Sequence, residues 1–302
     1  MSFDLAAAIA ETPAGGVVNV PAGTWATSLL IDKPISLLAH GVVVLDGQRR
    51  GTVLRVRTTG VVKVLGFSIV GGRTNTLGGG VLLDGGELEL TQCTLRFNEA
   101  PVYGGGALAL RAGTARIKSC RFEGNTGRQG GGILVDHDAT LVMRDSLVAQ
   151  NAGFDGGGLR VKESGNAELL GCTLADNVVL GETPTGGAVS LSGSTTASPR
   201  VTLSHCVVSE RKQGPELLHN FAGAPGTLTL THCLLPEWCH ALGGDNLFGP
   251  AGFVGQGNEP YALTAQSAAA GAGVPFAYGP GARDVLGRAR EGVDLGCFAA
   301  PR

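Results

Sequence analysis

The sequence predicts an all-β protein whose chain coils repeatedly into a single rod, a parallel β-helix. Three features recur along it about every 26 residues, and such a period is typical of repeat architectures in which each unit buries its apolar face against its neighbours. They are triple-glycine clusters at 78–80, 104–106, 130–132 and 156–158, cysteines at 93, 120, 172, 206 and 233, and asparagines at 98, 125, 151 and 177.

Each repeat is expected to contain three short strands. Leu88 and Leu90 alternate with Glu87 and Glu89, and Ile117 alternates with charged neighbours one period later. This period of two is the pattern of a half-buried strand. A second strand is expected just before each repeated asparagine and a third after each glycine cluster, with Gly, Asn and Asp in the turns. Alignment of the first-strand leucines predicts about nine coils.

We expect one domain, residues 1–302. Residues 1–16 would form an N-terminal cap, because Leu5 and Ile9 lie four residues apart on a short helix that closes the apolar end of the rod. Residues 17–235 would form the coils, and residues 236–302 an irregular C-terminal segment packed on the rod.

The cysteines and asparagines are expected to form two inward-facing ladders at corners of the coil. Asn amides would bond to the backbone of the next coil, as in stacked amide rows. Seven cysteines, an odd number, argue against a complete disulfide framework. Because Ser146 occupies the cysteine position in one coil, we interpret the cysteines as small buried filler. Cys206 and Cys233 lie on adjacent coils, within disulfide reach.

Both ends of the sequence and its repeats resemble known β-helix proteins. Residues 4–10 and 13–25 look like the opening of pectin-lyase-like right-handed β-helix proteins. The glycine clusters, the corner asparagines and the tail motifs at 246–248, 261–263, 283–284 and 294–296 are similar to bacterial surface proteins related to the polymorphic outer-membrane proteins. The resemblance implies a right-handed rod. It leaves the function open, because this scaffold carries lyases, hydrolases, epimerases, adhesins and passive rods.

Composition excludes some partners. A formal net charge of −2 and a pI near 6.3 indicate no nucleic-acid partner. No run of 18 apolar residues predicts membrane insertion. Residues 1–4 lack the basic and apolar regions of a signal peptide. We therefore expect either a cytoplasmic protein or an exported, cell-surface protein whose export signal precedes this sequence.

The outward side of the first strands is the usual substrate face that the resemblance implies. Two rows are expected on it: Glu89, Arg116, Val142 and Glu168, then Thr91, Lys118, Arg144 and Leu170. In a lyase, Lys118 or Arg144 would abstract the proton beside a uronate carboxylate that Arg116 binds. The alternative is that these charges form cross-strand pairs on a solvated face.

A metal ion would assist such a lyase. Asp136 and Asp138, in the turn before the next first strand, could hold calcium through oxygen ligands; no other cofactor is expected. None of the catalytic motifs known from these families is complete in this sequence. Of the residues typical of polygalacturonase-like hydrolases only Arg116-Ile117-Lys118 is present, and the Asp-Pro-His motif of mannuronan epimerases is absent.

A second candidate surface is the row of loops between each corner asparagine and its glycine cluster. Tyr103, Arg128, Phe154 and Asp155, with residues 183–185, would stack along one side of the rod and bind a glycan chain, as Glu89 and Glu168 would on the first-strand face. The alternative is that they are solubilising loop residues.

Two function classes follow. The first is a non-catalytic scaffold or adhesion module that binds a glycan or protein partner along its side. The alternative is a polysaccharide-active enzyme, with a uronate lyase favoured over a glycoside hydrolase.

The third strands predict an apolar stripe. If alternate residues face inward, Leu82, Leu108 and Leu134 face outward, continued by Arg160. Such a stripe is usually covered, so we expect the C-terminal segment or a second subunit over it. The latter would make the protein a homo-oligomer.

Overall fold

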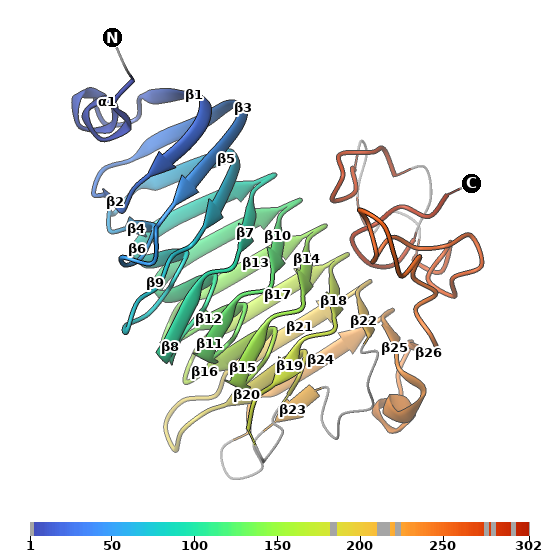
Figure 1. Cartoon of the computed structure of the whole chain (residues 1–302). Helices are drawn as coiled ribbons and strands as arrows, with labels where there is room; N and C mark the ends of the chain where they lie inside the picture. Colours follow the sequence, from blue (N-terminus) through green and yellow to red (C-terminus); the bar gives the residue numbers. More distant parts are fainter. Residues whose placement is uncertain are drawn as a thin grey trace.

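The computed structural model is a parallel β-helix, as predicted (Figure 1). It describes residues 3–181, 186–209, 218–220, 225–274, 278, 282–290 and 294–301. Successive coils stack with their strands parallel, and the irregular C-terminal segment lies at the side of the last coils. No helix in the described part of the chain has the length and apolar character needed to cross a membrane.

The first strands form the longest ladder, and each strand is hydrogen-bonded to the next coil. Several of these strands continue around a corner into a neighbouring side of the coil. Within the described ranges the ladder contains nine strands: β1 (Val17–Ala26), β3 (Ile35–Asp46), β5 (Val61–Val70), β6 (Val81–Thr91), β9 (Leu108–Lys118), β13 (Thr140–Arg144), β17 (Asn166–Leu170), β21 (Arg200–Ser204) and β24 (Thr227–Thr231).

The second and third sides of the coil consist of shorter strands. The second side contains β7 (Thr94–Arg96), β10 (Arg121–Glu123), β14 (Leu147–Ala149), β18 (Thr173–Ala175), β22 (Val207–Ser209), β25 (Leu234–Leu235) and β26 (Leu247–Phe248). The third contains β2 (Leu29–Ile31), β4 (Leu54–Val56), β12 (Ile133–Val135), β16 (Leu159–Lys162), β20 (Val189–Ser192) and β23 (Leu218–Asn220), with the first halves of β6 and β9.

A fourth parallel sheet was not predicted from the sequence. It forms from the segments between the corner asparagines and the glycine clusters, which we had expected to be loops. Its strands are β8 (Glu99–Gly104), β11 (Thr126–Gln129), β15 (Ala152–Asp155) and β19 (Val178–Val179). The backbones of β11, β15 and β19 pair in register, and β8 joins them with a register shift, even though the residues show no apolar alternation.

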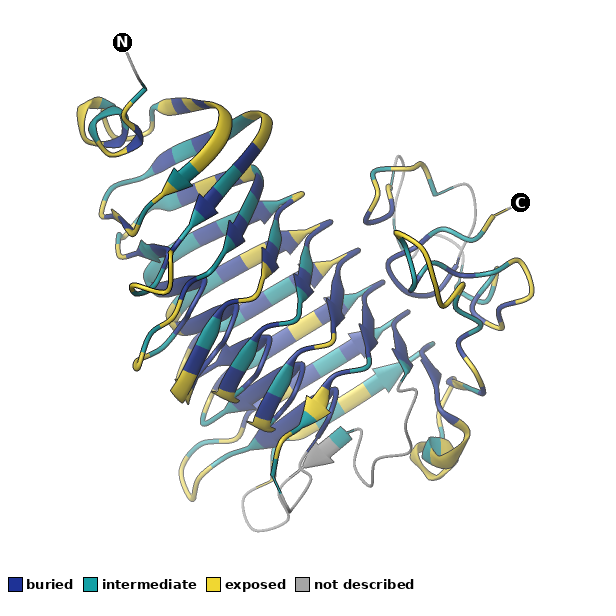
Figure 2. Cartoon of the chain, in the orientation of Figure 1, coloured by how far each residue is buried: buried dark blue, intermediate teal, exposed yellow. Residues whose placement is uncertain are grey.

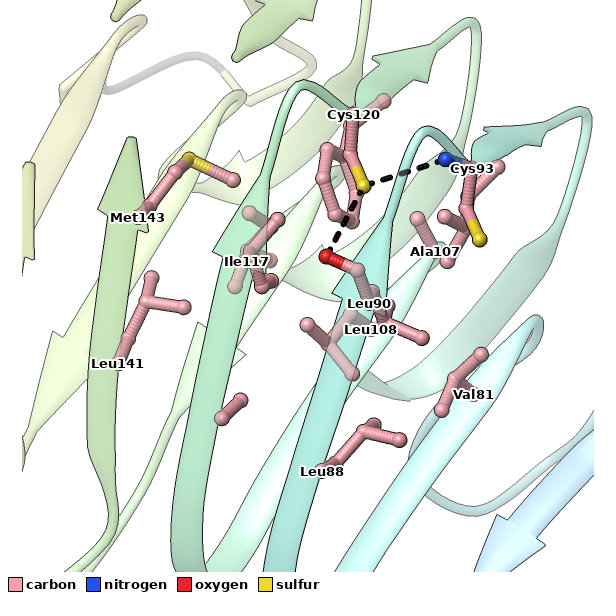
Figure 3. Close-up of a cluster of buried hydrophobic side chains, with 14 of the residues drawn as sticks. Val81, Leu88, Leu90, Cys93, Ala107, Leu108, Ile117, Cys120, Leu141 and Met143 are labelled. Atoms are coloured by element: carbon pink, nitrogen blue, oxygen red, sulfur yellow. Dashed lines mark hydrogen bonds between the residues drawn. The ribbon is translucent and has the colours of Figure 1, made fainter. Parts of the chain in front are cut away.

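The core runs along the axis of the rod. The apolar residue of each alternating pair is buried, and its charged neighbour faces solvent (Figure 2). Leu90, Ile117 and Met143 follow one another at the same register position of three stacked strands. Figure 3 shows these side chains packed together. Burying each stabilises the fold by roughly 1.5–3 kcal/mol before entropy is counted.

The cysteine ladder is confirmed. All five repeated cysteines and Ser146 are buried, and each cysteine is a free thiol. The backbone N–H of Cys93 donates to Cys120 Sγ at 3.3 Å (Figure 3), and that of Cys120 donates to Ser146 Oγ at 3.0 Å. Burial raises the pKa of the Cys206 thiol, which keeps it protonated and unreactive.

The asparagine ladder is also confirmed. Asn125 Oδ1 accepts from the backbone N–H of Asn98 at 3.0 Å, and Asn125 Nδ2 donates to the Leu95 carbonyl of the preceding coil at 3.0 Å. Asn151 and Asn177 repeat the arrangement. Each amide therefore satisfies backbone groups at a buried corner that would otherwise lack partners.

A left-handed residue precedes each ladder residue. Ser119, before Cys120, has φ 52°, and Gln150, before Asn151, has φ 57°. This conformation turns the chain sharply at the corner. His205 and His232 occupy two of these positions, and their rings stack with centroids 5.1 Å apart because the positions are equivalent in adjacent coils.

The glycine clusters bring two parts of the backbone together. A Cβ on Gly131 would lie 2.3 Å from the Ala152 carbonyl oxygen of the next coil's fourth-sheet strand. No side chain fits there. The fourth sheet is thereby held against the third strands, and it covers their outward residues.

The predicted stripe of Leu82, Leu108 and Leu134 is wrong in two respects. One of its three residues faces inward, and neither the C-terminal segment nor a second subunit covers the stripe. Val81 pairs with Leu108 and Leu82 with Ala109, so Leu108 faces inward and Ala109 takes the outward position. The cause is the length of β8, which has two more residues than β11 between the positions that pair with Gly127 and Gln129; Gly105, with φ 67°, thereby becomes the equivalent of Gly78, with φ 69°. Leu82, Ala109 and Leu134 are buried with Leu77 inside the chain, so they offer no exposed surface to a second subunit.

The N-terminus of the rod is closed by α1 (Leu5–Glu11). The Asp4 side chain caps this helix by accepting from the Ala7 N–H at 3.0 Å, and Leu5 and Ile9 are buried against the first coil. At the other end a short 3₁₀ helix, η1 (Glu237–Leu242), follows β25.

The C-terminal segment packs on the outer face of the later second strands. Its apolar residues form one cluster with outward residues of the rod: Leu147, Ala149, Ala175, Val207 and Leu234 against Tyr261, Leu263, Ala269, Leu295 and Phe298. The Tyr261 hydroxyl donates to Asp176 at 2.9 Å, and Arg290 lies 3.0 Å from Asp145.

The tail motifs have a structural role. Asp284 is fully buried and accepts from the backbone N–H groups of Leu286 and Arg288, both at 2.9 Å. Asp294 accepts from the backbone N–H groups of Gly271 and Ala300, at 2.7 and 3.0 Å. Both carboxylates hold loops that have no regular backbone hydrogen bonding.

Candidate functional site

The outer face of the first strands has the predicted register. Across neighbouring strands Glu89 pairs with Arg116, Arg116 with Val142, and Val142 with Glu168. In the next row, Lys118 pairs with Arg144. Neighbouring strands are about 4.8 Å apart, so each row brings its side chains into contact range.

Two ion pairs lie on this face. Lys63 Nζ lies 2.9 Å from Glu89, and Arg116 Nε donates to Glu87 at 2.6 Å. These half-exposed ion pairs contribute little to stability. Arg116 is therefore engaged with Glu87. Of the three cations predicted to act together on this face, the neighbouring pair Lys118 and Arg144 is left as the candidate.

Asp136 and Asp138 lie at the other end of β13 from Arg144, roughly 17 Å along the strand. Asp136 is buried, with its two oxygens 3.2 Å from Lys162 Nζ and 3.0 Å from His137 Nδ1. Asp138 accepts from Ser164 Oγ at 2.5 Å. Among the described residues no three carboxylate, histidine or cysteine side chains cluster as a metal site would require, so we propose no calcium step.

Two adjoining hollows lie further along the same face. The smaller, of about 270 Å³, is lined by Arg144, Glu168, Thr202 and Ser204, and the larger, of about 820 Å³, by Glu168, Arg200, Thr202 and Thr229 among others. Glu168 borders both. Sequence reasoning missed the hydroxyl side chains here because it looked for charged residues.

The fourth sheet presents its own outer surface, which we call the ledge: Val102, Tyr103, Arg128, Phe154, Val178 and Leu180. All six side chains are exposed, Tyr103 at 58% and Phe154 at 51%. Gly127 pairs with Gly153 and Gln129 with Asp155, so Arg128 and Phe154 lie side by side on adjacent strands. The sequence predicted the three central residues but not the valines and the leucine. Residues 183–185, which were also predicted here, lie outside the described ranges.

Asp155 does not belong to the ledge. Its carboxylate accepts from Ser190 Oγ at 2.7 Å and lies 3.0 Å from the buried Arg160 guanidinium. Burial lowers the pKa of Arg160, and Asp155 opposes that shift. Asp155 therefore neutralises the arginine beneath the ledge, and the prediction that it would face a ligand is not supported by its contacts.

Known proteins resemble this chain in fold. The family described as right handed beta helix region matches residues 55–236, which agrees with the predicted handedness. Among solved structures, the crystal structure of pectate lyase Pel9A is similar, with a TM-score of 0.57 and 14% identity over 98% of this chain and 91% of that chain. At this identity the likeness concerns the fold alone. No curated protein matches the sequence significantly.

Proposed function

This chain belongs to the right-handed β-helix family, and on that premise we propose that it binds a polysaccharide along the side of its rod, at the ledge. The observation that carries the proposal is the exposure of Tyr103, Arg128 and Phe154 on adjacent strands of one parallel sheet. Aromatic faces and an arginine at such spacing suit an extended chain of sugar rings.

The ledge is closely packed on the rod. Gly153, under its centre, could not carry a Cβ, which would meet the Gly156 carbonyl oxygen at 2.6 Å. The sheet is therefore pressed against the rod, and its side chains stand on fixed strands. Binding there would lose little backbone entropy, which favours affinity.

Arg128 determines the kind of sugar. A guanidinium binds a carboxylate with two parallel hydrogen bonds, and here it lies beside an aromatic ring that can support a sugar face. We therefore expect an acidic polysaccharide with a uronate next to Arg128.

The test is calorimetry or affinity electrophoresis with polygalacturonate, alginate and neutral dextran. Tyr103→Ala and Phe154→Ala should each weaken binding of an acidic polymer about tenfold, and Arg128→Gln should remove the preference for acidic over neutral polymers. Leu30→Ala, an equally exposed apolar site on β2, is the matched control. Unchanged binding in the Tyr103→Ala, Phe154→Ala double variant would exclude the ledge; binding to none of the polymers would leave a protein partner as the better proposal.

A second candidate is a uronate lyase on the first-strand face. The neighbouring pair Lys118 and Arg144, with a hollow that Arg144 shares with Glu168, is the observation that favours it. One of the two side chains, in its neutral form, would remove the proton beside the carboxylate while the other, as a cation, stabilises the enolate; the electrons of the enolate would then form the carbon–carbon double bond and expel the glycosidic oxygen, which takes a proton from water.

Ultraviolet absorbance of unsaturated ends, followed with and without calcium, tests this candidate. Turnover that is lost in Lys118→Ala and in Arg144→Ala but kept in Phe154→Ala would establish it. No turnover on any uronate polymer would exclude it and leave the binding proposal standing alone.

A further inference from the structure

A pocket of about 720 Å³ lies between η1 and the loop 249–255 that follows β26. Its lining includes Trp238, Pro250 and Phe253 on the apolar side and Ser209, Glu237 and His240 on the polar side. This volume is in the range of small-molecule sites, which combine apolar walls with a few polar groups. It is separate from both the ledge and the first-strand face.

The charge of the lining limits what can bind. Among the described residues that border the pocket none is Lys or Arg, and Glu237 is the one carboxylic acid. A carboxylate or phosphate ligand would therefore be repelled and left without a counter-ion. The ligand that suits this lining is neutral or cationic.

The polar groups accept more hydrogen bonds than they donate. His240 Nδ1 lies 3.0 Å from the Glu237 carbonyl oxygen, so Nδ1 is the donor there and Nε2 of the neutral ring is left as an acceptor. The Glu237 carboxylate adds two more acceptor oxygens. Such a set matches a ligand with several hydroxyl groups.

The walls of the pocket are held in place by other contacts. Phe253 meets the Tyr261 ring edge-on at 5.5 Å and bridges to Leu263, and the Val254 N–H donates to the Ala262 carbonyl at 2.8 Å. On the other wall, Pro236 is buried where η1 begins. Rigid walls lower the entropic cost of binding.

We propose that this pocket binds a neutral pyranose, with the sugar ring against the Trp238 indole and its hydroxyl groups donating to Glu237 and His240. An indole offers a flat apolar face of the size of a sugar ring. The site does not depend on the ledge, so it is a second saccharide site of different charge preference. A free monosaccharide and the end unit of a longer chain present the same chemistry.

The experiment uses the full chain with Trp25→Phe, which leaves Trp238 as the single tryptophan of the protein. Trp25 lies at the other end of the rod against Phe3, at 5.2 Å. The indole emission of Trp238 is followed during titration with glucose, galactose, mannose, their disaccharides and glucuronate. A saturable change with at least one neutral sugar, and none with glucuronate, is expected. Tighter binding of the disaccharide would identify a chain end as the ligand, and equal binding the free sugar.

Calorimetry then measures the contribution of each group. Trp238→Ala should weaken sugar binding about tenfold and Glu237→Gln roughly threefold. Glu237→Gln keeps the shape of an exposed side chain, so it tests the pocket even if Trp238→Ala loosens the fold. Phe154→Ala should leave sugar binding unchanged, which separates this site from the ledge.

Either of two results would overturn the proposal: no saturable response to any neutral sugar, or glucuronate binding as tightly as glucose. Unchanged affinity in both Glu237→Gln and Trp238→Ala would mean that the sugar binds elsewhere on the protein, and this result would also refute the proposal. None of these outcomes bears on acidic polymers at the ledge.

Discussion

On the outer face of the second strands, the early coils carry Ser68, Thr94 and Arg121, whereas later coils carry Leu147, Thr173, Val207 and Leu234 in the same row, three of them apolar. The early part faces solvent or carries charge, and the later part is covered by the C-terminal segment. The inward residues are apolar in both parts. Outward composition, which the repeat does not fix, therefore determines where an irregular segment can dock.

The border between the two parts is a charged contact. Arg121 pairs with Glu259 and lies 5.7 Å from the centre of the Phe298 ring. Burial raises the pKa of the neighbouring Glu123, and Arg121 opposes that shift. The segment thus ends its coverage where the rod's outer row changes from apolar to charged.

The largest effect is expected from Phe298→Ala. This ring is buried between the segment and the rod, so its loss should destabilise the docked segment by about 3 kcal/mol or more. Hydrogen exchange of residues 261–274 against those of β13 measures it. The matched control is the exposed Phe154→Ala, expected within about 0.5 kcal/mol. Equal protection losses in both variants would show that the segment does not form a core with the rod.

Asn125→Ala tests the rod in the same way. It removes the acceptor of the Asn98 N–H and the donor to the Leu95 carbonyl, both buried, and should cost about 2–3 kcal/mol. Urea denaturation of the whole protein gives the value, with exposed Asn258→Ala as the control. If the ladder amides stabilise only their own corner, the cost should appear in hydrogen exchange near β10 and not in global unfolding.

Acid should loosen the segment before the rod. His205 Nε2 accepts from the Val274 N–H at 3.2 Å, and burial, together with His232, lowers the pKa of His205. The unfolded state then binds the proton first, so docking is strongest above pH about 6.5, the ordinary histidine value, and weakens as the pH falls below it.

The measurement is limited proteolysis of the segment between pH 7.5 and 5. Cleavage should become several-fold faster at the acidic end. His232→Gln, which removes the neighbouring imidazole, should shift the onset to lower pH. A cleavage rate independent of pH would refute a role for His205 in docking.

The smallest effect is expected on the first-strand face. Arg116→Ala removes a half-exposed ion pair with Glu87 and should change stability by no more than about 0.5 kcal/mol. Denaturation at low and high salt measures it. A loss of more than about 1 kcal/mol in the free energy of unfolding would show that this ion pair stabilises the fold.

Much of the candidate site could be predicted from the sequence because the sequence repeats. Tyr103, Arg128 and Phe154 were found as equivalent positions of successive coils, and the structure places them on one exposed sheet. Asp155 was assigned with them because it also follows the repeat. Its contact with Arg160 depends on which face of a neighbouring strand is covered, and no spacing reveals this.

The error at Leu108 has a similar origin. The longer β8 sets the third strand one position away from the 26-residue spacing, and a shift of one residue moves a side chain to the opposite face of a sheet. The fourth sheet was missed because its glycine-rich strands lack the apolar alternation by which strands are recognised.

By itself, the sequence determined the coil and its internal ladders, since both depend on contacts between neighbouring repeats that recur every 26–27 residues. It also determined the α1 cap, through the four-residue spacing of Leu5 and Ile9. The position of the C-terminal segment was decided only by the tertiary structure. Its anchoring contacts join Arg121 to Glu259 and Asp145 to Arg290, across 138 and 145 residues. Such contacts occur once and carry no period, because they arise from the match between one irregular surface and one apolar patch.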